Sequence, residues 1–449
     1  MKILMVSYDM QDFGGLEEYA VNLAIGLKQR GQDVSYMSMA WVNPENQYSR
    51  RLKDAGIPLI QPPRWISDPV SDWDTKEHIL RNLMLILSPL TIFMGLGVSL
   101  LKRLPIKQAW KSAYNWLKGK VMDGVVGHDY RKPLGRVLLN WWNFRWHPEI
   151  IHIQGYTTTL LFVIDWAHIK GIPVAYEEHQ TPDPQFNWWK GFENTINKAD
   201  RVIAVSEKSA DGLRKVCKVT RPIVVRSPLL SDPFSSSGFQ KNYNHKDGKP
   251  FTITTVARLY VTKGLTYLLD TAALVKKTHP QVEFKVYGEG ELRDELLAKA
   301  ENLGLDGNNI FMGAFTSREE LTCIMAGTDI FLLSSILEGQ PLAVVEAMAY
   351  GCPIISTNVG GISELIADGV NGLLCPPEKP ECLAEKIKAL VVDSVTRERL
   401  GRAARGFYES SPFEAKAAAS FFISKYGEVL EEKKSLKEPK QWSVRKTKR

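Results

Sequence analysis

The residues best suited to chemistry are two glutamates that lie eight positions apart, Glu338 and Glu346. A predicted strand ends just before them at Ser334–Ser335, and Pro341 stands where the first turn of a helix should begin. The spacing predicts one carboxylate at the mouth of the helix N-terminus and the other just inside the helix. Free N–H groups and the helix dipole attract phosphate to such an N-terminus. A carboxylate beside it accepts hydrogen bonds from the paired hydroxyls of a ribose.

A second candidate group is the pair Arg258 and Lys263, in the loop after the predicted strand Phe251–Val256. Two cations in one loop can converge on a diphosphate, and an arginine can bind it through two parallel hydrogen bonds. Charge placed there would stabilise a departing diphosphate. Taken alone, such a pair is more typical of two solvated loop charges.

Glycines and histidines at predicted strand ends complete the candidate set. Glycine pairs let backbone N–H groups approach a ligand closely, and such glycines stand at Gly14, Gly15, Gly288, Gly360 and Gly361. The first pair lacks the Gly-x-Gly-x-x-Gly pattern, so a dinucleotide cofactor is not indicated. Two histidines, His152 and His179, end or follow strands, where a ligand would lie, and a structural role stays open for both.

Strand and helix patterns alternate along most of the chain. Short apolar strands are predicted at 2–8, 33–39, 150–153, 174–176, 201–205, 251–256, 283–287, 330–334 and 353–356. Alternating βα units predict an α/β protein with doubly wound parallel sheets covered by helices on both faces. We predict an N-terminal domain over 1–230, a linker over 231–249 and a C-terminal domain over 250–412. A helix over 413–432, expected to pack back on the N-terminal domain, and a basic tail over 433–449 would follow.

The motifs, in this order, resemble those of the retaining GT-B glycosyltransferases of glycosyltransferase family 4. The family's Glu-x7-Glu motif stands here as Glu338 to Glu346, and its Arg-x4-Lys-Gly motif begins at Arg258. Its Gly-Gly-x-x-Glu element ends at Glu364. The resemblance implies two Rossmann-like domains that face each other across a cleft. It also implies transfer of a sugar from a nucleoside diphosphate sugar to an acceptor hydroxyl with retention of configuration.

The resemblance assigns a role to each candidate residue. Glu338 and His179 would act on the donor sugar as catalytic residues, and His152 would lie on the acceptor side. The remaining candidates would bind the donor: Arg258, Lys263, Glu346, Gly339, Gln340, Pro341, Gly14, Gly15, Gly288, Gly360 and Gly361. Gln340 departs from the aromatic or aliphatic residue that the family often has there. Because no carboxylate is clearly placed as a nucleophile, the resemblance implies front-face transfer.

Basic charge is concentrated in two segments rather than spread over the chain. Residues 102–136 and 433–449 each carry a net charge of +7, whereas the whole chain carries only +7. An insert at about 60–147 holds seven of the twelve tryptophans, and residues 83–101 form an uncharged run. Mixed basic and aromatic residues are typical of the headgroup layer, so we expect 83–117 to contact an anionic membrane peripherally; a buried helix pair is the alternative.

Composition and small motifs exclude several classes. With 44% hydrophobic and 24% charged residues, the chain is neither disordered nor a many-span membrane protein. Five cysteines without a pairing pattern favour reduced thiols in an intracellular compartment. Together with the basic, aromatic insert, this predicts a cytoplasmic protein that associates peripherally with the inner face of the membrane. Asp72-Trp-Asp74 lies in a polar stretch without a strand pattern, so no metal is expected, and no nucleic-acid motif is present. The alternatives to a transferase are a nucleotide-sugar epimerase or hydrolase of the same fold, or a catalytically silent membrane adaptor.

Overall fold

The structure is a computed structural model, and it describes residues 1–10, 14–64, 111, 131–155, 158–226, 241, 243, 250–315, 317–411, 413 and 415–437. Several predicted features lie outside these residues. They are the segment 83–117 expected to contact a membrane, except Lys111, and the linker except residues 241 and 243. The Asp72-Trp-Asp74 segment and the tail from residue 438 also lie outside them.

The N-terminal domain is built on a parallel sheet with strand order β3-β2-β1-β4-β5-β6-β7. Its strands are β1 (Lys2–Ser7), β2 (Asp33–Ser38), β3 (Leu59–Ile60), β4 (Ile150–Gly155), β5 (Val174–Glu178), β6 (Arg201–Ala204) and β7 (Ile223–Val225). Its helices are α1 (Gly15–Gln29), α2 (Gln47–Asp54), α7 (Arg131–Trp146), α8 (Leu161–Lys170) and α9 (Glu207–Lys215). Every residue of the central strand β4 is buried, including the polar residues His152 and Gln154.

The C-terminal domain repeats this plan with strand order β10-β9-β8-β11-β12-β13. Its strands are β8 (Phe251–Val256), β9 (Val282–Tyr287), β10 (Phe311–Gly313), β11 (Ile330–Leu333), β12 (Ile354–Thr357) and β13 (Leu373–Cys375). Its helices are α10 (Leu265–Lys276), α11 (Arg293–Asn302), α12 (Gly307–Ile310), α13 (Arg318–Ala326), α14 (Leu342–Ala349), α15 (Ile362–Leu365), α16 (Pro380–Val392) and α17 (Ser394–Ser410). Two doubly wound α/β sheets are therefore present, and the predicted fold class is confirmed.

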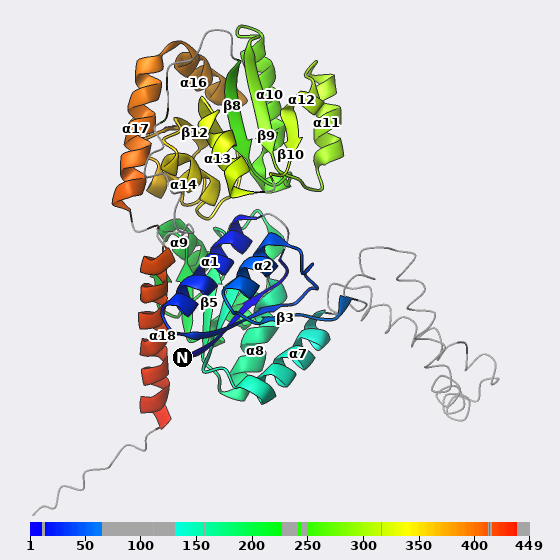
Figure 1. Cartoon of the computed structure of the whole chain (residues 1–449), viewed down its shortest axis with the longest axis vertical. Coiled ribbons are helices and arrows are strands. Elements are labelled where there is room, and N and C mark those ends of the chain that lie inside the picture. The colour runs from blue at the N-terminus through cyan, green and yellow to red at the C-terminus, as the bar shows by residue number, and fades with distance from the viewer. Residues whose placement is uncertain are drawn as a thin grey trace, which may run out of the picture.

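The two domains are stacked along the long axis of the molecule (Figure 1). One cluster of buried apolar side chains is shared between them, running from α1 and β2 to α14 and β12. The loops at the carboxyl ends of the strands meet at this interface, because the side chain of Arg258, two residues after β8, contacts Glu17 in the first turn of α1. Parallel α/β sheets place their ligand sites at these strand ends.

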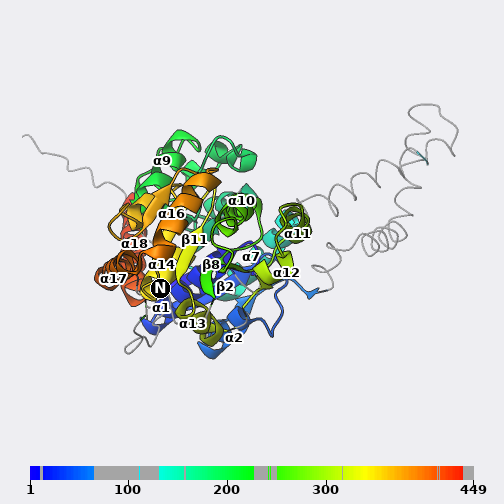
Figure 2. The same cartoon turned by 90° about the horizontal axis from the view of Figure 1, so that it is seen from above.

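The last helix, α18 (Ala415–Lys437), packs on α1 of the N-terminal domain. It lies on the same side of the molecule as α17 in both views (Figures 1 and 2). Its buried positions follow helical spacing: Ala418, Ala419, Phe422, Tyr426 and Val429. The chain thus leaves the C-terminal domain after α17 and returns to the N-terminal domain.

The prediction of five reduced thiols is wrong for one pair, because Cys375 and Cys382 form a disulfide. β13 ends at Cys375, and the first turn of α16 brings Cys382 back to a Cα–Cα separation of 5.9 Å, within the range for a disulfide. The sequence alone did not show this turn. Cys217, Cys323 and Cys352 are free.

The burial of Phe422 predicts how strongly α18 stabilises the fold. The substitution Phe422→Ala should lower the free energy of unfolding by about 3 to 5 kcal/mol, because it leaves a cavity in a wholly buried position. Urea unfolding followed by circular dichroism measures the change. The neighbouring Phe421→Ala is the control, because that ring is only partly buried. Equal losses in the two variants would contradict the packing described here.

Candidate functional site

The loop after β8 places two cations at the domain interface. Arg258 follows β8 closely, and Lys263 ends a short 3-10 turn at Val261–Lys263. Gly264 then adopts a φ of +59°, and a Cβ there would lie 2.2 Å from the carbonyl oxygen of Ser334. Only glycine fits this position, so it fixes the path of the loop against the end of β11.

Lys263 and Glu338 meet, as their assignment to one donor site requires. The Lys263 Nζ donates to Glu338 Oε1 at 2.6 Å, and the Ser335 hydroxyl donates to the same oxygen at 2.7 Å. Glu338 is buried in the loop between β11 and α14. Its carboxylate is therefore held by two donors, at the mouth of the helix that Glu346 occupies one turn further in.

Arg258 crosses the interface to Glu17. Its Nη2 donates to Glu17 Oε1 at 2.7 Å, and the other carboxylate oxygen of Glu17 is buried with no hydrogen-bond partner among the residues that the structure describes. Burial raises the pKa of Glu17, although the positive charge of Arg258 opposes that shift. Gly14 lies beside this pair: a Cβ there would sit 1.9 Å from Glu17 Oε2 and 2.5 Å from Arg258 Nη2. The arginine assigned to the diphosphate thus has an internal carboxylate as its partner.

Glu346 is linked to the other domain through Arg318, a residue that sequence reasoning missed. Arg318 Nη1 donates to Glu346 Oε1 at 2.7 Å, and its Nη2 forms an ion pair with Glu18 of α1. Arg51 on α2 binds the second oxygen of Glu18 at 2.8 Å. The available signal was a basic residue in the first turn of a helix that opens with the N-cap Ser317.

Burial and charge act against each other at these carboxylates. Burial raises the pKa of Glu346 despite the neighbouring Arg318. Burial would also raise the pKa of Glu18, but Arg318 and Arg51 outweigh it and the net shift is downward. For Arg318, the two carboxylates outweigh burial and raise its pKa. A series of three ion pairs with alternating charge therefore crosses the interface, linking Arg51, Glu18, Arg318 and Glu346.

His179 belongs to a set of polar side chains in the N-terminal domain that contact one another. The Nε2–H of His179 donates to Gln154 Oε1 at 2.7 Å, and Gln154 lies near Glu177 Oε2 at 3.5 Å. Glu177 also contacts His152 Nε2 at 3.0 Å and accepts from the hydroxyl of Tyr19. Burial lowers the pKa of His179 to about 4, so its imidazole is neutral near neutral pH. The ring is thus fixed in orientation by an amide and a carboxylate.

His152 does not reach the interface, contrary to the acceptor-side role predicted for it. It is wholly buried, and its Nδ1 contacts the hydroxyl of Tyr426 from α18. The ring of Phe422 lies 5.2 Å away. The Nε2 of His152 contacts Glu177 and Gln154, the two residues that lie beside His179.

The predicted glycines bring backbone segments into close contact. A Cβ at Gly339 would lie 2.1 Å from the carbonyl oxygen of His179, and one at Gly360 would lie 1.9 Å from that of Glu338. Gly361 donates its N–H to the Gly339 carbonyl at 2.7 Å. Gly15 begins α1 close to Leu342 of α14. These four glycines let Glu338 and His179 approach from opposite domains.

Three further predicted residues have contacts or caps within the C-terminal domain. Gln340 is buried; its Nε2 lies 3.4 Å from Glu364, and within the described part of the chain its Oε1 has no hydrogen-bond partner. Pro341 was expected in the first helical turn but forms the N-cap, and α14 begins at Leu342. Gly288 has a φ of +152°, and a Cβ there would lie 2.0 Å from the carbonyl oxygen of Ala257.

Glu364 fixes the N-terminus of α9 in the opposite domain. Its two oxygens accept from the backbone N–H groups of Glu207 and Lys208 at 3.1 and 3.0 Å. Ser206 is the N-cap of α9 and accepts from the Ser209 N–H at 2.9 Å. The family's Gly-Gly-x-x-Glu element therefore joins the two domains in this chain.

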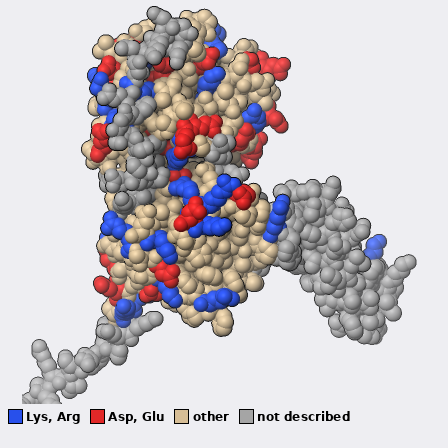
Figure 3. Space-filling model, viewed as in Figure 1, with Lys and Arg blue, Asp and Glu red and all other residues tan. Residues whose placement is uncertain are grey.

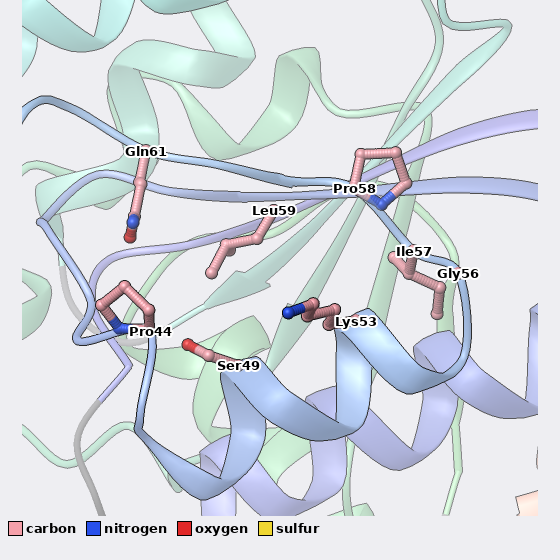
Figure 4. Close-up of a pocket in the computed structure, with 8 residues that line it drawn as sticks. All are labelled: Pro44, Ser49, Lys53, Gly56, Ile57, Pro58, Leu59 and Gln61. Atoms are coloured by element: carbon pink, nitrogen blue, oxygen red, sulfur yellow. The ribbon is translucent and has the colours of Figure 1, made fainter.

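A cavity of about 410 Å³ lies away from these residues, between α2 and β3 (Figure 4). Its lining comprises Pro44, Ser49, Lys53, Gly56, Ile57, Pro58, Leu59 and Gln61. Within the described ranges, no group of three His, Cys, Asp or Glu side chains could hold a metal ion. A search of those same ranges finds no helix with the length and apolar character needed to cross a membrane.

The comparisons with known proteins agree with this geometry. Residues 237–407 match the family model for glycosyl transferases group 1, and residues 120–228 match the one for Glycosyltransferase Family 4. Two solved structures, Anabaena HepE with UDP and an S. aureus TarM mutant with fondaparinux, alpha-GlcNAc-glycerol and UDP, have TM-scores of 0.62 and 0.66 at 18% and 15% identity. They cover 95% and 96% of this chain and are themselves covered to 100% and 99%. The matches and the fold together support a GT-B glycosyltransferase.

Curated relatives are glycosyltransferases as well. The glycogen synthase of Mycobacterium tuberculosis is 22% identical over 423 residues, which are 90% of this chain and 89% of that protein. The alpha-D-kanosaminyltransferase of Streptomyces kanamyceticus is 22% identical over 56% of this chain and 69% of its own length. The amylovoran biosynthesis glycosyltransferase AmsK of Erwinia amylovora is 34% identical over 30% of this chain and 35% of its own length. Polysaccharide biosynthesis thus recurs among the relatives.

Glu178, one residue before His179, predicts a pH dependence of stability. Burial raises its pKa to about 7, although hydrogen bonds from Tyr176 and from the Gln180 N–H lower it. Between pH 4.5 and 7 the folded state then binds more protons than the unfolded state at this group. Its contribution to stability therefore falls as pH rises through that window, by about 3 kcal/mol in total.

The lowered pKa of His179 makes stability rise with pH between pH 4 and 6.5, opposite to the effect of Glu178. Comparing the original chain with the variant Glu178→Gln isolates the contribution of Glu178, because His179 is present in both. The free energy of unfolding of the variant minus that of the original chain should be larger at pH 8 than at pH 5. Urea unfolding at both pH values measures the difference. A difference that does not change with pH would show that Glu178 is already ionised at pH 5.

Proposed function

We propose that this chain transfers a hexosyl or related sugar from a nucleoside diphosphate sugar to an acceptor hydroxyl, with retention of configuration. The observation that carries the proposal is the meeting of Lys263, Glu338 and Glu346 around the start of α14, with Arg258 on the same side of the interface. This combination provides cations for a diphosphate and carboxylates for the sugar hydroxyls on either side of it. The named relatives are a kanosaminyltransferase, a glycogen synthase and an amylovoran biosynthesis glycosyltransferase, which fits a saccharide acceptor.

The diphosphate would bind between Arg258 and Lys263. Both side chains are partly exposed, and each is paired with a carboxylate, Glu17 and Glu338 respectively. An incoming diphosphate would compete with Glu17 for the N–H donors of Arg258, because Arg258 Nη2 donates to Glu17 Oε1 in this structure. Positive charge then neutralises the leaving group as its bond to the sugar breaks.

The two sugars of the donor would be held by different carboxylates. Glu346 accepts from the ribose hydroxyls, with Arg318 fixing its orientation. Glu338 accepts from hydroxyls of the transferred sugar, with Ser335 and Lys263 fixing its position. His179 is neutral and donates its Nε2–H to Gln154, so its Nδ1 is left to accept from a sugar hydroxyl.

The transfer itself would occur on one face of the sugar. The bond from the anomeric carbon to the phosphate oxygen breaks, and the acceptor oxygen bonds to that carbon from the same side. The acceptor proton moves to the leaving phosphate oxygen, so no protein base is needed. Closure of the two domains excludes water, which would otherwise hydrolyse the donor.

We further propose that the acceptor belongs to polysaccharide or glycolipid assembly at the cytoplasmic face of a membrane. The support is the Trp-rich basic insert together with relatives in polysaccharide biosynthesis. An epimerase or hydrolase of the same fold, or a silent adaptor, is not favoured by the glycosyltransferase matches. Product analysis with labelled donor separates transfer from these, because only transfer gives an acceptor-linked sugar.

Glu346→Ala tests the donor site directly. A thermal-shift panel of UDP-, GDP- and ADP-sugars should show stabilisation of the original chain by one donor, and this shift should vanish in the variant. The control is Glu385→Ala, which removes an exposed carboxylate on α16 and should keep the full shift. Retained donor stabilisation in Glu346→Ala would remove Glu346 from the site.

Glu17→Gln tests the exchange of partners at Arg258. Because the variant removes an anion that competes with the diphosphate, inorganic pyrophosphate should bind about fivefold more tightly, the equivalent of about 1 kcal/mol. Isothermal titration calorimetry measures the affinity. Glu18→Gln is the control, since its partner Arg318 serves Glu346 instead, and no such gain is expected. Weaker pyrophosphate binding by Glu17→Gln would mean that Glu17 positions Arg258 rather than competing for it.

A further inference from the structure

Helix α7 carries an apolar face that the N-terminal domain leaves exposed. Val137, Trp141 and Phe144 are spaced at helical intervals and are 63%, 48% and 81% exposed. The other exposed large apolar side chains within the described part of the chain form no stripe along one helix: Ile169, Val261, Met312, Val370, Val392 and Val395 lie on different elements or loops. Isolated apolar side chains at a surface are ordinary, but a contiguous stripe with two aromatic rings marks a contact surface.

The opposite face of α7 is firmly anchored. Leu139 is wholly buried, and Trp142 and Trp146 pack against the core of the domain. Asn140 accepts from the Trp166 indole at 3.1 Å, and the Lys2 ammonium donates to the Trp146 carbonyl at 3.0 Å. The exposed stripe therefore belongs to a fixed helix whose orientation is set by the fold.

Charge on this face is of one sign. The sequence of α7 contains no Asp or Glu, and exposed Arg136 and Arg145 flank the stripe. The Arg145 guanidinium lies over the Trp141 ring at 5.4 Å from its centroid. In Figure 3 the part of the N-terminal domain where α7 lies shows basic and uncharged residues. The face thus combines apolar side chains with positive charge alone.

We propose that the α7 face, defined as Arg136, Val137, Trp141, Phe144 and Arg145, binds the surface of an anionic lipid bilayer. Tryptophan and phenylalanine enter the boundary between headgroups and acyl chains, and the flanking arginines contact anionic headgroups. The inference rests on the membrane context of the proposed function and adds a defined docking surface to it.

The composition of the face favours a bilayer over a protein partner. A second copy of the chain would place like-charged arginines opposite each other, which opposes self-association. The stripe is convex, along one helix, rather than a groove that would receive a peptide. Anionic headgroups offer complementary charge over the whole stripe, and their attraction depends on salt.

Flotation of the full chain with vesicles tests the proposal. The triple variant Val137→Ser, Trp141→Ser, Phe144→Ser should bind vesicles of phosphatidylcholine with 30% phosphatidylglycerol at least fivefold more weakly than the original chain. The matched control replaces three other exposed apolar residues: Ile169→Ser, Val392→Ser and Val395→Ser. Its binding should be unchanged. Arg136→Gln with Arg145→Gln should reduce binding to the anionic vesicles alone, leaving that to pure phosphatidylcholine vesicles as it was.

The outcomes separate this proposal from the proposed function. Equal flotation of the triple variant and the original chain overturns the α7 face as a docking surface, as does a change in oligomeric mass that accompanies the substitution. Thermal unfolding of each variant verifies that it is folded. The donor-induced thermal shift should be the same in all of them, because α7 lies away from the donor residues. Loss of flotation with an intact donor shift supports the α7 face, whereas an absent donor shift in the original chain contradicts only the proposed function.

Discussion

The structure depends on the pairing of opposite charges across the domain interface. Two adjacent acids in the first turn of α1, Glu17 and Glu18, each bind one arginine of the C-terminal domain, Arg258 and Arg318. Both carboxylates are buried, so each would be strongly destabilising without its partner. The two pairs differ in what they do for a donor. In the proposed reaction the diphosphate competes with Glu17 for Arg258. Arg318 by contrast would keep Glu18 while it holds Glu346. The proposal therefore expects one contact of this interface to open and the other to remain when the donor binds.

The N-terminal side of the site is built by hydrogen bonds rather than by ion pairs. Tyr426 of α18 contacts His152, which contacts Glu177, and Glu177 stands beside Gln154 and His179. Most of this set has no exposure, so its geometry follows from packing alone. A neutral His179 requires that the ring be kept from protonation, and burial does this. The last helix of the chain thus determines the position of a side chain that the sequence places more than two hundred residues earlier.

The sequence predicted the fold well, because strand and helix periodicity, loop glycines and the Glu-x7-Glu spacing are local signals. Arg258, Lys263, Glu338 and Glu346 were found for the same reason: each stands at a fixed offset from a strand or helix end. Sequence analysis missed three neighbours of the site, Arg318, Glu17 and Glu18. Each has a partner in the other domain, and no local sequence pattern predicts such a contact. His152 was misplaced because a strand-end position does not reveal that α18 will cover it. The disulfide at Cys375 depended on a turn that spacing alone does not encode.

Helix α1 connects the contacts that hold the domains together. Its first turn carries both cross-domain acids, Gly15 approaches Leu342 of α14, and its outer face packs on α18. Because α18 follows α17 of the C-terminal domain directly, the chain crosses the interface between Ser410 and Ala415. Helix α1 thus joins the cross-domain charge pairs at its N-terminal end to the packing contact with α18 along its length.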